Sequence, residues 1–241
     1  MRRLPVDIGV VADADAGARA LLAALGKAGA AVGDRSQRMA EAKAAAAAAI
    51  QRIQPQLAYL QAIREVLPDD GFFVDEISQM GFASWYGFPV HRPRSFITAG
   101  CQGTLGSGFP SALGVKAAFP DRPVVSITGD GGFMFAVQEL ATAVQYGLNV
   151  VTVVFNNQSF GNVRRDQMQG FGGRLIGSDL VNPDFLTLAE SFGVAGFRAA
   201  TPEELTGVLE IALQLGAPAL IEVPIERGSE ASPWEFLTPS F

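Results

Sequence analysis

The stretch GDGGFMFAVQELATAVQYGLNVVTVVFNN, residues 129–157, contains an acidic and an amide side chain that each follow an apolar run. The first run, VVSIT, ends just before this stretch, and the second, VVTVVF, lies within it. Asp130 follows the first run, and Asn157 closes the second. Carboxylate and amide oxygens suit Mg²⁺, which prefers about six oxygen ligands and commonly takes some from phosphate and water. Gly131 and Gly132 carry no side chains, so a phosphate can approach the backbone amides that begin the next helix. These residues indicate a site for a divalent cation and a diphosphate.

One strand–helix–strand unit explains how the acid and the amide meet. VVSIT and VVTVVF are predicted strands, and MFAVQELATAVQYG between them is a predicted helix. Such a crossover is right-handed and returns the chain to the same edge of a parallel sheet. We therefore expect Asp130 and Asn157 at the carboxyl ends of neighbouring strands, the edge at which ligands bind in such sheets.

The chain from Gly71 onward repeats this alternation of strands and helices. Short apolar runs predict strands at residues 71–77, 95–100, 123–130, 150–157, 193–200 and 219–225. Amphipathic stretches predict helices at residues 109–119, 134–147, 183–193 and 202–216. Continuous apolar strands separated by such helices indicate an α/β fold, a parallel sheet with helices on both faces.

The first part of the chain has a different pattern. VDIGVVADA, residues 6–14, predicts a strand, and residues 16–29 predict a helix that ends at a glycine. The alanine-rich residues 33–54 predict a surface helix or helical linker, and Pro55 begins another helix. We place a domain boundary between roughly residues 30 and 55, so that residues 1–54 form the tail of a domain whose beginning is missing, plus a linker, and residues 55–241 form the ligand-binding domain.

Composition narrows the class of protein. The 241 residues are 49% hydrophobic and 17% charged, which permits a buried core and argues against disorder. No run of about 18 apolar residues indicates a membrane span. The single cysteine, Cys101, cannot form an internal disulfide, so we expect a soluble, cytoplasmic protein. The net charge is −6, and the acidic body makes nucleic acid an unsuitable partner.

Two motifs together resemble the thiamine-diphosphate (ThDP) enzymes of the acetolactate synthase and pyruvate decarboxylase type. Gly129-Asp130-Gly131 followed by Asn156-Asn157 is similar to the metal motif of that family. RPRSFITAGCQGTLGSGFPSALG is similar to the segment that precedes it in acetolactate synthases. The resemblance extends from about Gly71 to Pro224 and implies the diphosphate-binding domain of such an enzyme, preceded by a remnant of its middle domain.

The resemblance also implies roles for individual residues. Mg²⁺ would be bound by the side chains of Asp130 and Asn157 and by the backbone carbonyl of Ser159. The other implied cofactor contacts are the diphosphate-binding motif residues Gly129, Gly131 and Gly132, a closing loop formed by Phe160, Gly161 and Asn162, and a diphosphate-contacting loop at Ser78 and Gln79. Gly103 would accept a hydrogen bond from the aminopyrimidine, and Leu105 would hold the cofactor in the bent conformation needed for its activation.

The implied reaction is decarboxylation of a 2-oxo acid, followed by release of an aldehyde or by addition to a second carbonyl compound. Relatives begin it with a glutamate from a separate pyrimidine-binding domain, usually on another subunit. We therefore expect a half-enzyme, inactive alone, that works in a homo- or hetero-oligomer or lacks its N-terminal half. Two alternatives stay open: a non-catalytic ThDP-binding or assembly module, and part of a 2-hydroxyacyl-CoA lyase or oxalyl-CoA decarboxylase.

The substrate side departs from acetolactate synthases, which usually carry a methionine and a tryptophan where this chain has Asn162 and Asp166. Arg164 or Arg165 could instead bind a substrate carboxylate or a CoA phosphate, or both could be surface arginines of a solvated helical turn. A dinucleotide site is disfavoured, because GCQGTLGSG spaces its glycines as G-x-x-G-x-x-G-x-G, whereas the dinucleotide motif has G-x-G-x-x-G.

Overall fold

The computed structural model describes residues 7–29, 33–100 and 103–237, so Cys101 lies outside the described residues. The chain divides into two compact units, Met1–Ala46 and Ala47–Phe241. The first unit holds helix α1 (Ala14–Lys27) and the beginning of helix α2 (Ser36–Ile50), and neither helix has a buried residue.

The prediction of a strand at residues 6–14 is wrong for residues 7–14, the part that the structure describes. Residues 7–13 form no strand, and α1 begins at Ala14. Asp13 caps this helix, because its side chain accepts hydrogen bonds from the backbone N–H groups of Asp15 and Ala16. An apolar run needs a neighbouring strand to satisfy its backbone groups, and none of the described residues supplies one here.

The second unit contains one six-stranded sheet in which every neighbouring pair is parallel. The strands lie in the order β2-β1-β3-β4-β6-β5. In chain order they are β1 (Phe72–Val74), β2 (Phe96–Ile97), β3 (Val124–Gly129), β4 (Val150–Asn156), β5 (Ala195–Arg198) and β6 (Ala219–Pro224). Each falls within a predicted strand, and the predicted fold class is confirmed.

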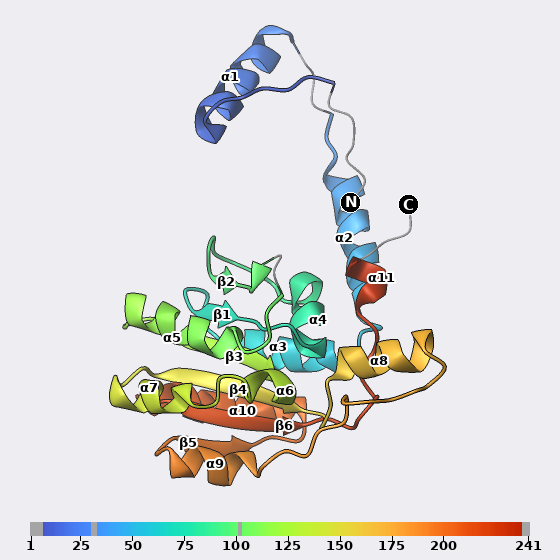
Figure 1. Ribbon diagram of the computed structural model, residues 1–241. Coiled ribbons are helices and arrows are strands. Elements are labelled where there is room, and N and C mark those ends of the chain that lie inside the picture. The colour runs from blue at the N-terminus through green and yellow to red at the C-terminus, as the bar shows by residue number, and fades with distance from the viewer. Residues whose placement is uncertain (1–6, 30–32, 101–102, 238–241) are drawn as a thin grey trace. The chain divides into compact units, whose positions relative to one another are not determined.

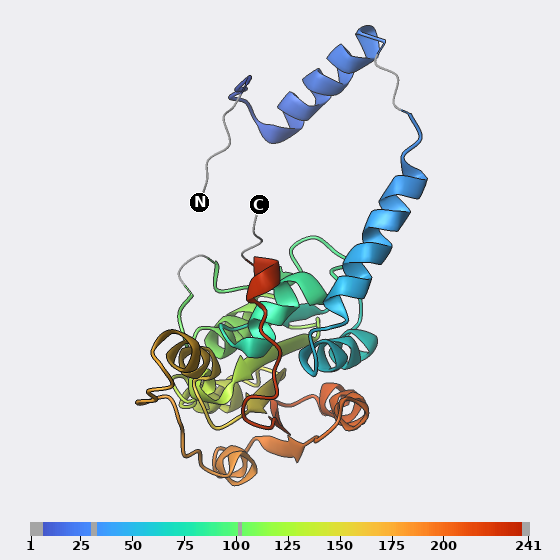
Figure 2. The ribbon, with the colours of Figure 1, turned by 90° about the vertical axis from the view of Figure 1, so that its right-hand side faces the viewer.

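Helices cover both faces of this sheet (Figures 1 and 2). The helices that follow α2 are α3 (Gln56–Val66), α4 (Gln79–Gly87), α5 (Gly108–Ala118), α6 (Asp130–Phe133), α7 (Glu139–Gln145), α8 (Gly161–Gly170), α9 (Phe185–Ser191), α10 (Pro202–Gln214) and α11 (Trp234–Leu237). Alternate strand positions separate two apolar cores: Val125 and Ile127 pack with α3, α4 and α10, whereas Val124 packs with α5, α7 and α9. The sheet is therefore buried on both faces, as its continuous apolar strands require.

The helices near the sheet edge differ from the prediction in their boundaries. The helix predicted after the glycine motif begins only at Glu139, and residues 134–138 form turns closed by hydrogen bonds such as Phe135 N–H to Gly132 O. Ser78 and Gln79 were predicted in a loop, but Ser78 caps α4 and Gln79 is its first residue. Gly161 and Asn162, also predicted in a loop, form the first turn of α8.

Among the described residues, no helix combines the length and the apolar character that crossing a bilayer requires.

Candidate functional site

The edge of the sheet brings Asp130 beside the turn that follows β4. β3 and β4 pair in parallel register from Val124↔Val150 to Gly129↔Phe155, so the two chains leave the sheet side by side. Asn182 then joins them, because its side-chain amide donates to Asp130 Oδ2 at 2.7 Å and to Asn156 Oδ1 at 2.9 Å. The predicted neighbour relation of the two strands is confirmed.

A cavity of about 370 Å³, here called the main cavity, opens at this edge. Its wall includes Ser78, Gln79, Leu105, Gly129, Asp130, Gly131, Gly132, Asn157, Ser159, Phe160, Gly161 and Asn162. Every site residue predicted from the sequence except Gly103 therefore lines one cavity. Gly103 lies outside this wall, in a backbone conformation with φ of 62°, and its Cα faces the side chain of Ile77, which does line the cavity.

The two paired asparagines have different surroundings. Asn156 holds the turn: its Oδ1 accepts from the backbone N–H of Gln158, which has a positive φ of 54°, and its Nδ2 donates to Glu222 at 2.7 Å. Asn157 faces the cavity, and its Oδ1 accepts from the backbone N–H and the hydroxyl of Ser159 at 3.0 and 2.9 Å. Asn156 is thus structural, whereas Asn157 lines the main cavity with its amide oxygen held by Ser159.

Asp130 is a buried carboxylate whose charge is supported by several donors. Burial raises the pKa of Asp130 above its ordinary value. Hydrogen bonds from Asn182 and from the backbone N–H groups of Gly131, Gln158 and Ser159 act in the opposite direction. Burial therefore disfavours the charged form of Asp130, and the hydrogen bonds favour it. A nearby cation would also favour the charged form.

Glu230 is a site residue that the sequence analysis missed. It follows β6 in a polar stretch, lines the main cavity, and accepts a hydrogen bond from Asn157 Nδ2 at 2.6 Å. Burial raises the pKa of Glu230, the Asn157 hydrogen bond and the charge of Arg165 oppose this, and the charge of Asp130 adds to the rise. No local pattern distinguishes Glu230 from the other acids of its segment, because its partner lies 73 residues away in the chain.

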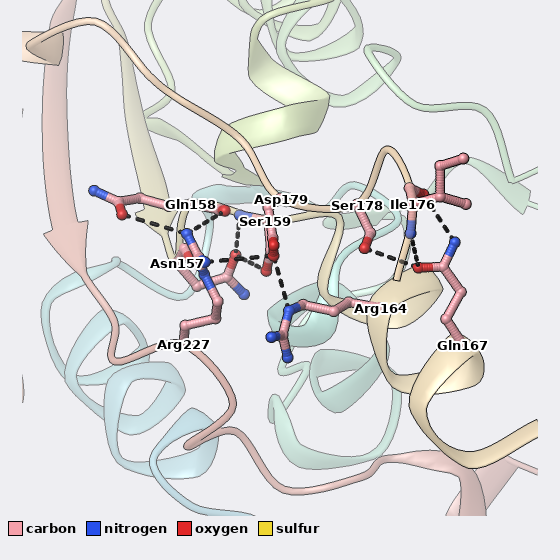
Figure 3. Close-up of polar contacts among 9 residues, drawn as sticks. All are labelled: Asn157, Gln158, Ser159, Arg164, Gln167, Ile176, Ser178, Asp179 and Arg227. Atoms are coloured by element: carbon pink, nitrogen blue, oxygen red, sulfur yellow. Dashed lines mark hydrogen bonds and ion pairs between the residues drawn. The ribbon is translucent and has the colours of Figure 1, made fainter. Parts of the chain in front are cut away.

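A short antiparallel bridge between Ser159 and Asp179 holds the turn that carries Asn157 (Figure 3). Leu180 N–H donates to Gln158 O, and Arg227 donates to the carbonyls of Asn157 and Gln158 at 3.3 and 2.9 Å. These contacts come from the loop after α8 and from the loop after β6. They fix the backbone around the Ser159 carbonyl from two sides.

Glu76 is a second residue that the sequence analysis missed. It is buried two residues after the end of β1 and packs beneath the cavity wall at Gly132. Thr128 Oγ1 donates to Glu76 Oε2 at 2.5 Å, and the backbone N–H of Gly106 donates to Oε1. A Cβ on Gly108 would lie 2.7 Å from Glu76 Cβ, and one on Gly132 would meet the Glu76 carboxylate. Packing against Glu76 therefore requires glycine at both positions.

The oxygen donors around Asp130 are few and mixed in kind. In the described ranges, no group of three or more His, Cys, Asp or Glu side chains is placed to hold a metal ion. One buried carboxylate, one amide oxygen and one backbone carbonyl would leave about half of the six positions around Mg²⁺ to ligand oxygens and water. Such a set suits a cation that arrives with a phosphate-bearing ligand.

Comparison with known proteins decides the family. Residues 76–223 match the family model described as "Thiamine pyrophosphate enzyme, C-terminal TPP binding domain". The chain belongs to the thiamine pyrophosphate enzymes. Thiamine pyrophosphate and ThDP are the same compound, so the predicted family and the ThDP part of the cofactor prediction are confirmed together, while the Mg²⁺ part stays a prediction.

The relatives place the chain among thiamine pyrophosphate enzymes of the acetolactate synthase type. It is 40% identical over 156 residues to the probable acetolactate synthase large subunit of Methanococcus aeolicus, covering 64% of this chain and 26% of the relative. It is 39% identical over 166 residues to the acetolactate synthase isozyme 3 large subunit of Escherichia coli K12, covering 68% and 29%. The chain thus spans about a quarter to a third of these relatives.

A solved structure supports the same fold. The ThDP-dependent 4-hydroxybenzoylformate decarboxylase of Rhodococcus jostii RHA1 superposes with a TM-score of 0.66 at 33% identity, over 71% of this chain and 32% of that chain. The all-parallel sheet of this chain is therefore the diphosphate-binding fold of a thiamine pyrophosphate enzyme.

In this thiamine pyrophosphate enzyme domain, we predict that Gly132→Ala lowers the free energy of unfolding by about 1–3 kcal/mol, because the added methyl group meets the Glu76 carboxylate. Gly114→Ala is the matched control: Gly114 lies in α5 with no atom within 4 Å of an added Cβ, so this change should stabilise the helix by up to about 1 kcal/mol. Urea unfolding of both variants measures the difference, and equal stabilities would contradict the packing argument.

Glu76 should also give the stability a pH dependence. Burial and the charge of Asp75 raise the pKa of Glu76, opposed by its hydrogen bonds, so the folded protein keeps this proton to higher pH than the unfolded chain does. Stability from this group is fully present below the unfolded pKa and is lost as pH rises through the folded pKa. We predict that wild type loses stability relative to Glu76→Gln as pH rises above the ordinary glutamate value of 4.5.

Urea unfolding between about pH 4 and pH 8 measures this difference for Glu76→Gln. The exposed Glu65→Gln in α3 is the control for removing a glutamate charge from the protein surface. A flat difference for Glu76→Gln as well would show that Glu76 does not hold its proton in the folded state.

Proposed function

We propose that the main cavity binds ThDP together with Mg²⁺, and that the chain is the diphosphate-binding part of a 2-oxo acid decarboxylase or carboligase. The observation that carries this proposal is the placement of Asp130 beside the turn of Asn157 and Ser159, at the carboxyl edge of a parallel sheet. Membership of the thiamine pyrophosphate enzymes supplies the cofactor, and the donor set supplies the reason for the metal.

Three protein oxygens would hold the metal: a carboxylate oxygen of Asp130, the amide oxygen of Asn157 and the backbone carbonyl of Ser159. Their chemistry fits Mg²⁺, which would take its remaining ligands from the diphosphate and water. The cation would also offset the burial that raises the pKa of Asp130. Glu230 would keep the Asn157 amide in one orientation by accepting from its Nδ2.

The rest of the wall fits the other parts of the cofactor. Gly129, Gly131 and Gly132 present backbone to the diphosphate, and Leu105 with Ile77 forms an apolar wall that excludes water. We assign further contacts to Ser78, Gln79, Phe160, Gly161 and Asn162, and the aminopyrimidine contact to the carbonyl of Gly103. When bound, ThDP supplies an electron sink for breaking the bond between the carbonyl and carboxyl carbons of a 2-oxo acid.

Other polypeptide would complete the active site. Since the chain spans only about a quarter to a third of its acetolactate synthase relatives, we propose that a pyrimidine-binding part comes from elsewhere in a homo- or hetero-oligomer. The part described here would bind the cofactor but would not turn over substrate alone. A cytoplasmic location belongs to the same proposal, because one cysteine provides no internal disulfide.

Titration of ThDP with and without Mg²⁺ tests the site. We expect Mg²⁺-dependent binding that Asp130→Asn weakens at least about tenfold, because the charged one of the three proposed protein ligands is lost. Asp70→Asn removes an exposed carboxylate elsewhere and should bind as wild type does. Unchanged affinity in Asp130→Asn, or binding indifferent to Mg²⁺, would remove the site.

A second experiment separates a catalytic part from a passive module. The purified chain, loaded with ThDP and Mg²⁺, should release no CO₂ from pyruvate or from a dicarboxylic 2-oxo acid such as 2-oxoglutarate. Adding a separately expressed pyrimidine-binding polypeptide of the acetolactate synthase type should restore release. Turnover by the chain alone would refute its dependence on a partner, and silence in the mixture despite tight ThDP binding would favour a non-catalytic module.

A further inference from the structure

A second cavity, of about 350 Å³ and here called the arginine cavity, adjoins the main cavity. Gln79, Asn157, Ser159, Gly161 and Glu230 line both cavities, so the two share a wall. The distinctive lining residues of the second are three arginines: Arg164, Arg165 and Arg227. The two cavities are therefore adjacent, which would let one end of a substrate in the main cavity enter the arginine cavity.

Two of these arginines already have structural partners (Figure 3). Asp179 accepts from Arg164 Nε at 2.9 Å and from Arg227 at 3.4 Å. Arg227 also holds the carbonyls of Asn157 and Gln158. These contacts place both guanidinium groups. Asp179 and the Glu230 of the cavity wall are two carboxylates against three arginines, which leaves positive charge at the cavity.

The positive charge of Arg165 is the least balanced by neighbouring carboxylates among the three arginines. Its guanidinium donates to two neutral amide oxygens, Gln79 Oε1 at 2.7 Å and Asn162 Oδ1 at 3.2 Å. Within the described part of the chain, no carboxylate lies within 4.0 Å of it. Burial lowers the pKa of Arg165, and the charges of Glu230 and Asp166 oppose this. A half-buried cation held in place by amides has N–H donors left for an anion.

The charge that Arg165 binds should persist through the reaction. A 2-oxo acid loses its first carboxylate as CO₂, so a cation paired with that group would stabilise the ground state and oppose its departure. A carboxylate at the far end of the substrate keeps its charge throughout, and binding it costs the chemical step nothing. The arginine cavity suits this second carboxylate.

We propose that the arginine cavity binds the distal carboxylate of a dicarboxylic 2-oxo acid, with Arg165 as the residue that selects it. The inference rests on the proposed function of the main cavity, since it assigns the class of substrate that reacts there. It also accounts for the polar residues Asn162 and Asp166 on α8: Asn162 positions the guanidinium, and Asp166 adds to the field that keeps it charged.

Two acids of five carbons provide a matched pair of probes. 2-Oxoglutarate ends in a carboxylate, whereas 2-oxopentanoate ends in a methyl group. Calorimetric titration into the full chain, loaded with ThDP and Mg²⁺, should show 2-oxoglutarate binding at least about tenfold tighter, with a preference that falls as salt is added. Arg165→Gln should abolish the preference, and Arg165→Lys should keep part of it.

Arg174→Gln is the control, because Arg174 is exposed and does not line the arginine cavity. Thermal unfolding of each variant and its affinity for ThDP with Mg²⁺ are measured alongside. Equal affinity for the two acids in wild type, no binding of either in the millimolar range, or a preference retained in Arg165→Gln would overturn the proposal. Loss of Mg²⁺-dependent ThDP binding in wild type would instead overturn the proposed function of the main cavity.

Discussion

The floor of the main cavity depends on one buried carboxylate, that of Glu76. β1 pairs with β3 in parallel register up to Val74↔Ser126, and two residues farther along each chain the Thr128 hydroxyl donates to Glu76. Glu76 then accepts from Gly106 in the glycine-rich segment and packs against Gly132 next to the metal motif. Strand β1, strand β3 and the glycine-rich segment are thereby held together beneath the cavity. Their glycines are needed as much for contact with this side chain as for contact with a ligand.

The electrostatics of the site follow from how many acids are buried around it. Burial raises the pKa of Asp130, Glu76 and Glu230 alike, so each pays for its negative charge. A diphosphate would add to this negative charge unless a cation came with it. Asp130 and Glu230 border the cavity, so a divalent ion there would relieve both. Glu76 lies under the floor and is supported by hydrogen bonds instead. These buried acids would thus make the proposed metal and ligand binding interdependent.

The sequence was sufficient to predict features that depend on local pattern or on neighbouring strands. The six strands, the α/β class and the meeting of Asp130 with the turn after β4 all follow from apolar periodicity and crossover geometry. The strand expected at residues 6–14 is absent from its described part, because a strand also needs a partner. The sequence could not identify three residues of the site, because each is defined by a partner 52 or more residues away. These pairs are Glu76 with Thr128, Asn182 with Asp130, and Glu230 with Asn157. Such contacts appear only once the sheet order is known.

In the proposed assignment, the cofactor and the substrate are bound by different parts of the fold. The proposed cofactor contacts come mainly from the sheet edge, whose backbone is fixed by six paired strands and cannot change without cost. The proposed substrate contacts come from α8, where the helical period puts Gly161 and Arg165 on one face and lets Asn162 touch Arg165. Under this proposal, side chains on an α8 turn can vary while the proposed metal ligands stay in place. The arginines on this helix would then adapt the site to a dicarboxylic acid without changing the cofactor contacts.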